Sequence, residues 1–262
     1  MRGTPPRTGR SRDTLALIFP SATAALLLLA AEVLQRLHAL PVFIPAPSQL
    51  VVAIIARPGL VIQNVVPTAV KAAEGYLAAI MATFCAAALA ALVSRLSGVV
   101  YNLGVILSAI PIIALAPLLA LWLGTGPSLQ IVIAALSSQF PMLVGMMQGM
   151  AAADERQREL FHILSASPLQ SFRYLLVPGA LPFVFAGLKI AAPSAVLGTV
   201  TAEWAGADRG IGAMMLYALF SYDIVTVWLS VLLTCLLASG AYAICAMIER
   251  RLVFWASGEQ LA

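Results

Sequence analysis

Long apolar runs are the feature that most constrains the fold of this 262-residue chain. Each is about 20 residues long, which is the length an α-helix needs to cross the hydrocarbon core of a bilayer. Only 10% of the residues are charged, compared with about a quarter in a soluble globular domain. The runs therefore predict an all-α polytopic membrane protein with about six transmembrane helices. They lie at roughly 14–33, 74–93, 99–122, 129–150, 183–202 and 224–247.

The membrane domain is expected at 14–255, between a basic tail at 1–13 and a short C-terminal tail at 256–262. A proline-rich polar segment at 36–67 follows the first run. Within it, residues 47–56 predict a short apolar helix, too short to cross a bilayer, that lies along the membrane interface.

The distribution of basic residues predicts the orientation of the chain. Six spans place both termini on one side, and the side richer in arginine is the cytoplasmic one. That side holds the termini and the polar stretch at 153–182, whereas 36–67 and 203–223 face outward. The basic residues on the predicted cytoplasmic side are Arg2, Arg7, Arg10, Arg12, Arg95, Arg156, Arg158, Arg173, Arg250 and Arg251; those outside are Arg36, Arg57, Lys71 and Arg209.

The polar stretch at 153–182 separates the fourth and fifth runs and predicts two short amphipathic helices outside the bilayer. Acidic residues at its start suit the positive end of a helix. Ser167 is a suitable N-cap for the second helix, with Pro168 at its first position and Gln170 completing a capping box. Such a hairpin either packs against its own helix bundle as a connecting loop or forms a docking site for another protein.

Prolines are predicted to affect both the polar stretch and the membrane spans. Pro178 and Pro182 are expected to end the second short helix before the fifth span begins. Within the spans, Pro111, Pro117 and Pro193 are expected to kink the third and fifth helices. The carbonyls freed at these kinks either line a solute pathway or reflect bending for packing alone.

Glu203 stands at the outer end of the fifth run, beside Trp204. An acid at membrane depth is a candidate functional residue, although it could instead cap the helix that follows. Arg209 and Asp223 are candidate partners for it. Lys71 and Glu74, three residues apart, are expected to pair on a helix surface.

The chain contains no Gly-x-x-x-x-Gly-Lys-Ser/Thr phosphate loop, no Ser-His-Asp cluster and no metal-ligand spacing. We therefore expect no catalytic, cofactor-binding or metal-binding residue, and no enzyme activity. If ATP drives transport, its energy must enter from a partner chain.

The polar stretch resembles the cytoplasmic EAA loop of ABC importer permeases of the binding-protein-dependent family. Glu159-Leu160-Phe161 stands where that pattern has Glu-Ala-Ala, Ser165 stands where it has glycine, and Leu175-Leu176-Val177-Pro178 follows at the same spacing. Leu160, Phe161 and Ser165 depart from the pattern. Leu40–Pro47, Thr68–Tyr76, Ile110–Gly124 and Thr201–Gly212 are similar to segments of the nitrate/sulfonate/taurine-type permeases.

The resemblance implies a permease that works as a pair, with the substrate pathway between the two helix bundles.

 Two ATPase subunits, which carry the ATP and magnesium, would dock on the cytoplasmic loops, and an extracytoplasmic binding protein would deliver the solute. The coupling residues implied on this chain are Glu159, Leu160, Phe161, Ser165, Ala166, Ser167, Pro168 and Pro178.

The expected location is the bacterial inner membrane, with a second copy of the chain completing a homodimer. The resemblance favours a sulfonate-, taurine- or nitrate-like anion as the solute, although similar permeases also move neutral or cationic small molecules. The alternatives are a secondary transporter, which the nearly charge-free span centres disfavour, and a membrane assembly protein without cargo.

Overall fold

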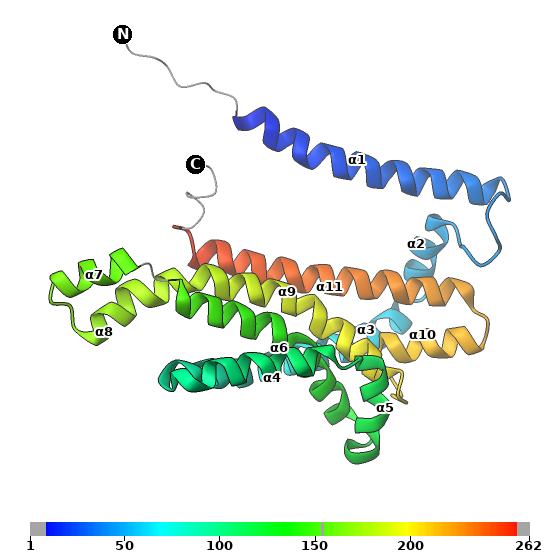
Figure 1. The fold of residues 1–262 in the computed structure, drawn as a ribbon. Helices are drawn as coiled ribbons and strands as arrows, with labels where there is room; N and C mark the ends of the chain where they lie inside the picture. Colours follow the sequence, from blue (N-terminus) through cyan, green and yellow to red (C-terminus); the bar gives the residue numbers. More distant parts are fainter. Residues whose placement is uncertain (1–8, 153–154, 256–262) are drawn as a thin grey trace, which may run out of the picture.

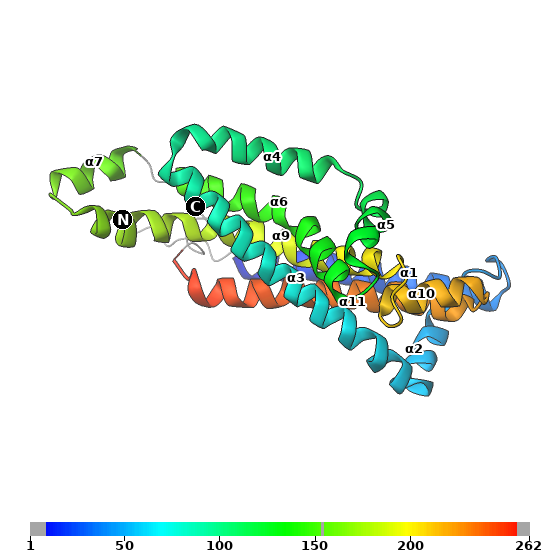
Figure 2. The same ribbon diagram turned by 90° about the horizontal axis from the view of Figure 1, so that it is seen from below.

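The computed structural model describes residues 9–152 and 155–255, and in these ranges the regular structure is entirely helical (Figures 1 and 2). The predicted tail at 256–262, most of the tail at 1–13 and Asp154 lie outside or largely outside these ranges. The helices are α1 (Gly9–Arg36), α2 (Pro47–Ala56), α3 (Pro58–Leu92), η1 (Ser94–Leu96), α4 (Ser97–Ala109), α5 (Ile112–Leu123), α6 (Pro127–Ala151), α7 (Glu155–Ile163), α8 (Pro168–Ser171), η2 (Phe172–Leu176), α9 (Val177–Glu203), α10 (Ile211–Phe220) and α11 (Ile224–Leu252).

The all-α polytopic membrane fold is confirmed. Four helical segments of the described chain are long and apolar enough to cross a bilayer: α3, α6, α11 and the segment from Leu169 to Glu203. The helices α4 and α5 qualify only as a pair, bent by 95° at their junction. Helix α1 covers the first predicted run but is not among these spans. The described residues therefore give four spans, or five with the bent pair, where six were predicted.

Two predicted boundaries are wrong. Helix α3 begins at Pro58, inside the proline-rich segment 36–67 and well before the predicted start of the second span near Glu74, and it runs through Pro67. A proline is favourable in the first turn of a helix, where its missing N–H costs nothing, and this explains the start at Pro58.

The second wrong boundary is at Pro178 and Pro182, which do not end the short helix of the polar stretch. Helix α8, the π-helical segment η2 and α9 follow one another without a break. The N–H of Val177 bonds to the carbonyl of Phe172, five residues back. This wider turn shifts the carbonyls beneath Pro178, so its ring avoids the clash that a proline meets in an α-helical turn.

Pro111 does more than kink the third predicted span. It stands as the N-cap of α5, between the end of α4 and the start of α5, and the chain turns there by 95°. Pro117 and Pro193 lie inside α5 and α9, which continue past them. A proline removes one backbone hydrogen bond, and only at position 111 does the helix stop.

Helices α6 and α9 form the centre of the bundle and lie side by side in both views (Figures 1 and 2). Glycines allow their backbones to meet. A Cβ added at Gly145 would lie 2.6 Å from the carbonyl oxygen of Phe183, and one at Gly149 would lie 2.9 Å from that of Ala180. A Cβ at Gly187 would lie 2.5 Å from the carbonyl oxygen of Pro141. Small residues are the usual means of close helix packing in membranes, where no hydrophobic effect drives helices together.

Helix α1 stands apart from the bundle in Figure 1 and is joined to it through α2. The Glu32 carboxylate accepts hydrogen bonds from the Ser48 backbone N–H at 3.0 Å and from the Ser48 hydroxyl at 2.8 Å. It also forms an ion pair with Arg36 at 2.7 Å. Glu32 thereby caps the first turn of α2 from the neighbouring helix.

The close approach of α6 and α9 predicts that Gly187→Ala destabilises the protein by about 1–3 kcal/mol, because the added methyl group meets backbone atoms that cannot move aside. The matched control is Gly179→Ala in the same helix, where a Cβ would meet nothing within 4 Å. Alanine is the better helix former by about 1 kcal/mol, so the control should keep or raise stability. Thermal unfolding of the purified protein in detergent measures both, and equal midpoints for the two variants would contradict the prediction.

Candidate functional site

The polar stretch forms a helical hairpin that projects from the end of the bundle where α11 ends (Figure 1). Its turn lies between α7 and α8. Ser165 adopts a positive φ of 51°, and the N–H of Ala166 bonds to the carbonyl of Phe161 at 3.0 Å. Ser165 thus takes the left-handed conformation that glycine adopts most easily, and it does so at the position where the EAA pattern has glycine.

The predicted capping box at the start of α8 is present. The backbone N–H of Ser167 donates to the side-chain oxygen of Gln170 at 2.7 Å, and the N–H of Gln170 donates to the Ser167 hydroxyl at 3.3 Å. Pro168 is the first residue of α8. The turn and the second helix of the hairpin therefore form as their local sequence dictates.

The hairpin exposes apolar side chains. Leu160, in the EAA-like part of α7, is half exposed, as is Phe172 just after α8. Ile163 and Leu169 are about three-quarters or more exposed, at 80% and 74%. Phe161 and Ala166 are partly buried, Glu159 is exposed, and Pro178 lies beyond the hairpin in the first turn of α9. Exposed apolar side chains gathered at one place on a protein typically mark an interaction surface.

Three of the four residues predicted to line a solute pathway do not lie together in the structure. Pro111 and Pro117 are exposed on the bent α4–α5 pair, and Pro193 is partly buried in α9. Their place along a solute pathway stays a prediction.

The fourth candidate, Glu203, is fully buried at the last turn of α9. Its carboxylate accepts a hydrogen bond from the Thr68 hydroxyl of α3 at 2.7 Å and another from the Gly212 N–H of α10 at 2.7 Å. The Thr68 oxygen in turn accepts from the N–H of Ile211 at 2.9 Å. We call Asn64, Thr68, Glu203 and the 210–212 backbone the outer clamp, since Asn64 also accepts from the Gly210 N–H at 3.1 Å.

Glycine is required at two positions of the outer clamp. Gly210 has a φ of 132°, and a Cβ there would overlap the Glu203 carboxylate. A Cβ at Gly212 would meet the carbonyl oxygen of Val200 and the Cβ of Glu203. The carboxylate fills this space and accepts from the Gly212 N–H in the first turn of α10, which is the capping role foreseen as the alternative for this acid.

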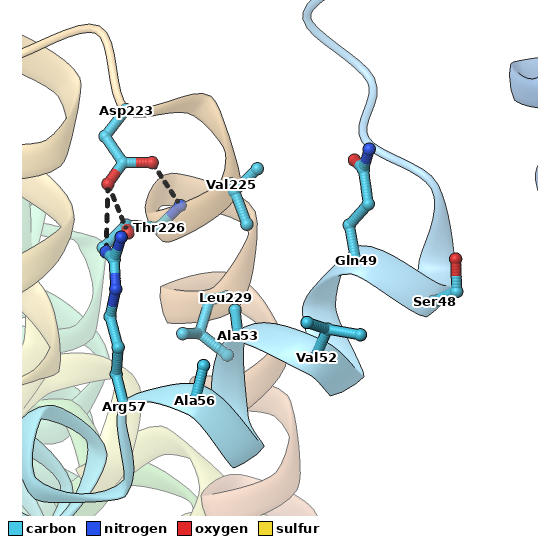
Figure 3. A pocket seen from close by; sticks show the side chains of 10 residues that line it. All are labelled: Ser48, Gln49, Val52, Ala53, Ala56, Arg57, Asp223, Val225, Thr226 and Leu229. Carbon is cyan, nitrogen blue, oxygen red and sulfur yellow. Dashed lines mark hydrogen bonds and ion pairs between the residues drawn. The ribbon is translucent and has the colours of Figure 1, made fainter.

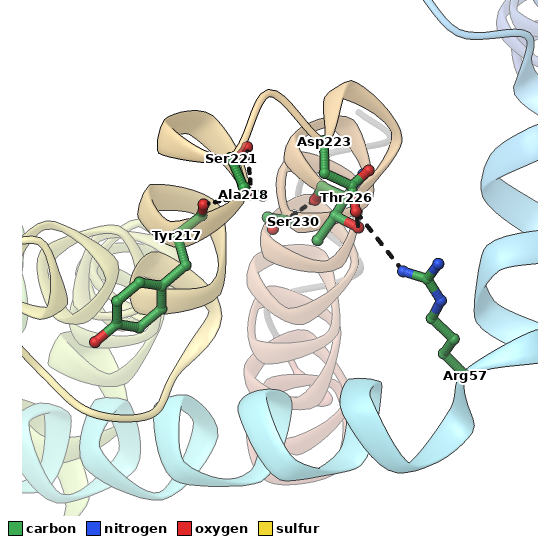
Figure 4. Close-up of polar contacts among 7 residues, drawn as sticks. All are labelled: Arg57, Tyr217, Ala218, Ser221, Asp223, Thr226 and Ser230. Atoms are coloured by element: carbon green, nitrogen blue, oxygen red, sulfur yellow. Dashed lines mark hydrogen bonds and ion pairs between the residues drawn. The ribbon is translucent and has the colours of Figure 1, made fainter.

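Neither candidate partner pairs with Glu203. Asp223 instead caps α11 by accepting hydrogen bonds from the Thr226 N–H at 3.1 Å and the Thr226 hydroxyl at 2.7 Å, and it lies 3.7 Å from the Arg57 guanidinium (Figure 4). These hydrogen bonds, helped by Arg57, hold the pKa of Asp223 below its ordinary value. Arg209 has no ion-pair partner among the described residues. The Asp-x-x-Thr spacing at 223–226 is the sequence signal for this cap.

The end of the bundle away from the hairpin also carries two open recesses, of about 430 and 380 Å³. Arg57, Asp223 and Thr226 contribute to both. The first recess lies between α2 and α11, with Val52 and Leu229 facing it (Figure 3). The second lies between α3 and α10, and Glu203 lines neither.

The outer clamp predicts that Glu203→Ala destabilises the protein by about 1–3 kcal/mol, because the buried Gly212 N–H loses its acceptor and the Thr68 hydroxyl keeps only the longer bond to the Asn64 carbonyl at 3.1 Å. Glu74→Ala is the control, since Glu74 is an exposed acid whose ion pair with Lys71 contributes at most about 1 kcal/mol. Thermal unfolding in detergent compares the two. Equal losses would mean that the clamp contributes no more than a surface ion pair.

Comparison with known proteins places these features in a family. Residues 75–254 match the model of the binding-protein-dependent transport system inner membrane component. A formylaminopyrimidine transport permease of Halalkalibacterium halodurans is 29% identical over 90% of this chain and 95% of its own length. A riboflavin transport system permease of Chloroflexus aurantiacus is 30% identical over 56% of this chain and 55% of its own length.

A putative aliphatic sulfonates transport permease of Escherichia coli is also 30% identical, over 56% of each chain. The matched model covers more than half of the sequence and includes the hairpin, the central helices and the outer clamp residues of α9 and α10. The chain belongs to the binding-protein-dependent inner-membrane component family, the permeases of ABC transporters.

Proposed function

We propose that this chain is the permease subunit of an ATP-driven importer, in which two copies form the solute pathway. Two ATPase subunits would bind the α7–α8 hairpin, and an extracytoplasmic binding protein would deliver the solute. The observation that carries this proposal is the hairpin itself, a folded and capped structure with exposed Leu160, Ile163 and Leu169 at one end of the bundle. A simple connection between two spans needs no such apolar surface.

The connection from the hairpin into the bundle supports a mechanical role. Helical structure is continuous from Pro168 through η2 to Glu203, so a displacement of α8 moves α9 with it. The glycine contacts tie α9 to α6, and the outer clamp ties the end of α9 to α3 and α10. Movement driven at the cytoplasmic hairpin would thus reach the outer end as a rigid-body motion, as alternating access requires.

The orientation in the inner membrane follows from the same geometry. The start of α1, the hairpin and the end of α11 lie toward the same end of the molecule (Figure 1). Arg250 and Arg251 are in the last turn of α11. The positive-inside rule supports a cytoplasmic location for this end, and we infer that both termini lie on the same side.

The charges within the spans favour a neutral solute. Lys71 of α3 is paired with Glu74 at 2.8 Å, and Lys189 of α9 is paired with Glu249 of α11 at 2.6 Å. These are the only lysine or arginine residues of the described spans that lie away from the helix ends, and neither is left free to hold an anion. We infer a small neutral heterocycle of the pyrimidine type, consistent with the relative that matches along 90% of this chain.

A sulfonate-like anion is the second candidate, because relatives named as sulfonate permeases match about half of the chain. The two solutes differ in charge, so direct uptake separates them. Either solute fits the same arrangement of permease, ATPase and binding protein.

Uptake into proteoliposomes tests the function. The permease is reconstituted with the ATPase and the binding protein encoded beside it, and labelled formylaminopyrimidine and the anion ethanesulfonate are supplied in turn. We expect uptake of the pyrimidine that requires ATP and the binding protein, with little uptake of ethanesulfonate. Preference for ethanesulfonate would change the assigned solute and leave the proposed transport mechanism unchanged. Uptake driven by an ion gradient without ATP would exclude an ABC importer.

The hairpin is tested with substitutions at its turn and helix. We expect Glu159→Ala combined with Phe161→Ala to abolish ATP-dependent uptake, because both residues belong to the proposed ATPase contact, while the amount of permease in the membrane stays normal. Ser165→Gly is the matched control. It keeps the positive φ and removes a cost of about 1 kcal/mol for a side chain in that conformation, so uptake should persist. Normal uptake by the double variant would contradict the assignment.

A further inference from the structure

The recess between α3 and α10 has the size and chemistry of a solute site. Its volume of about 380 Å³ lies within the range of small-molecule pockets in proteins. One wall is α3, with Leu60, Gln63 and Asn64, and the other is α10, with Met214 and Tyr217. The recess lies at the outer end of the bundle, where a delivered solute would first meet the permease.

Several polar groups in this recess are exposed to solvent and have no partner among the described residues. The Gln63 amide, the Tyr217 hydroxyl and the side chains of Asp208 and Arg209 make no hydrogen bond or ion pair with another described residue. Tyr217 points away from the Arg57–Asp223 pair in Figure 4. An amide offers both donors and an acceptor, and a tyrosine offers a ring face beside a hydroxyl, so these groups suit a flat solute with hydrogen-bonding edges.

The charges around the recess balance. Arg57 and Arg209 are matched by Asp208 and Asp223, and Arg57 and Asp223 already pair with each other at 3.7 Å. A wall without net charge does not concentrate anions. This lining therefore fits a neutral or zwitterionic solute better than a sulfonate.

The outer clamp fixes the distance between the two walls. Asn64 lines the recess, and its side-chain oxygen holds the Gly210 N–H just before α10. One turn further along α3, Thr68 holds both Ile211 and Glu203. Because these contacts are buried and mutually bonded, α10 cannot shift against α3 without breaking them, and the recess keeps its shape before any solute arrives.

We propose that this recess is the outer reception site of the permease, where the solute released by the binding protein is held before it enters the pathway. Gln63 and Tyr217 contact the solute, and the outer clamp positions the helices that carry them. The proposal rests on the importer function proposed above and adds a solute-binding role for residues of the permease itself.

Thiol labelling tests the site independently of transport. In a variant whose three native cysteines are replaced, Gln63→Cys is compared with Ile62→Cys, its neighbour on the same helix, which is 61% exposed and outside the recess. A membrane-impermeant cationic methanethiosulfonate is added from the outer side. We expect the thiol at position 63 to react readily, since the recess opens to the outer water. No reaction at position 63 would overturn the proposal.

Solute protection is the second measurement on the same variants. Binding protein loaded with formylaminopyrimidine or with the anion ethanesulfonate is added before the reagent, and unliganded binding protein controls for steric shielding by the protein itself. Slower labelling at position 63 with one loaded form, beyond the effect of the unliganded form, supports the site and identifies its solute class. Protection by neither solute overturns it, even if uptake in proteoliposomes is intact.

Uptake kinetics then distinguish a contact between Gln63 and the solute from a purely structural role of Gln63. Gln63→Ala should raise the KM for uptake roughly three- to tenfold, the effect of one lost hydrogen bond, with little change in the maximal rate. Ile62→Ala is the control and should leave both unchanged. A fall in maximal rate with an unaltered KM would assign Gln63 to the motion of the bundle and not to the solute.

Discussion

The close contact of α6 and α9 is the constraint on which the rest of the bundle depends. At Gly145, Gly149 and Gly187 the two backbones lie so close that an added methyl group would meet backbone atoms of the other helix. In a bilayer such contacts supply the packing that apolar burial supplies in water. Because α9 also continues into η2 and α8 at one end and into the outer clamp at the other, this contact sets where both functional regions lie.

Local features of the chain could be read from sequence, and contacts between distant segments could not. The Ser167–Gln170 capping box and the turn at Ser165 depend on residues within a few positions, and the structure has both. By contrast, Thr68 and Glu203 are 135 positions apart, and no periodicity or spacing connects them. Glu203 could be singled out as an acid at membrane depth, but its partners required the fold.

Prolines were the least reliable guide, because their effect depends on what surrounds them. Pro111 breaks its span, Pro193 leaves α9 continuous, and Pro178 follows a π turn that accommodates its ring. In each case the sequence marks a missing N–H, whereas the outcome depends on whether the neighbouring carbonyls find other donors. The same reasoning explains why α3 could begin at Pro58 within the proline-rich segment 36–67.

The outer clamp also makes the residues that can be accepted at positions 203, 210 and 212 depend on one another. The carboxylate of Glu203 occupies the space that a side chain at 210 would need, and at 212 a Cβ would meet the Val200 carbonyl oxygen and the Glu203 Cβ. A larger residue at 210 therefore requires that the acid be lost or shortened, one at 212 is blocked by the backbone in addition, and loss of the acid leaves the buried Gly212 N–H without its acceptor. Neither step is neutral by itself, so the Glu-to-Gly spacing should be inherited as a unit while the surrounding membrane-facing residues drift.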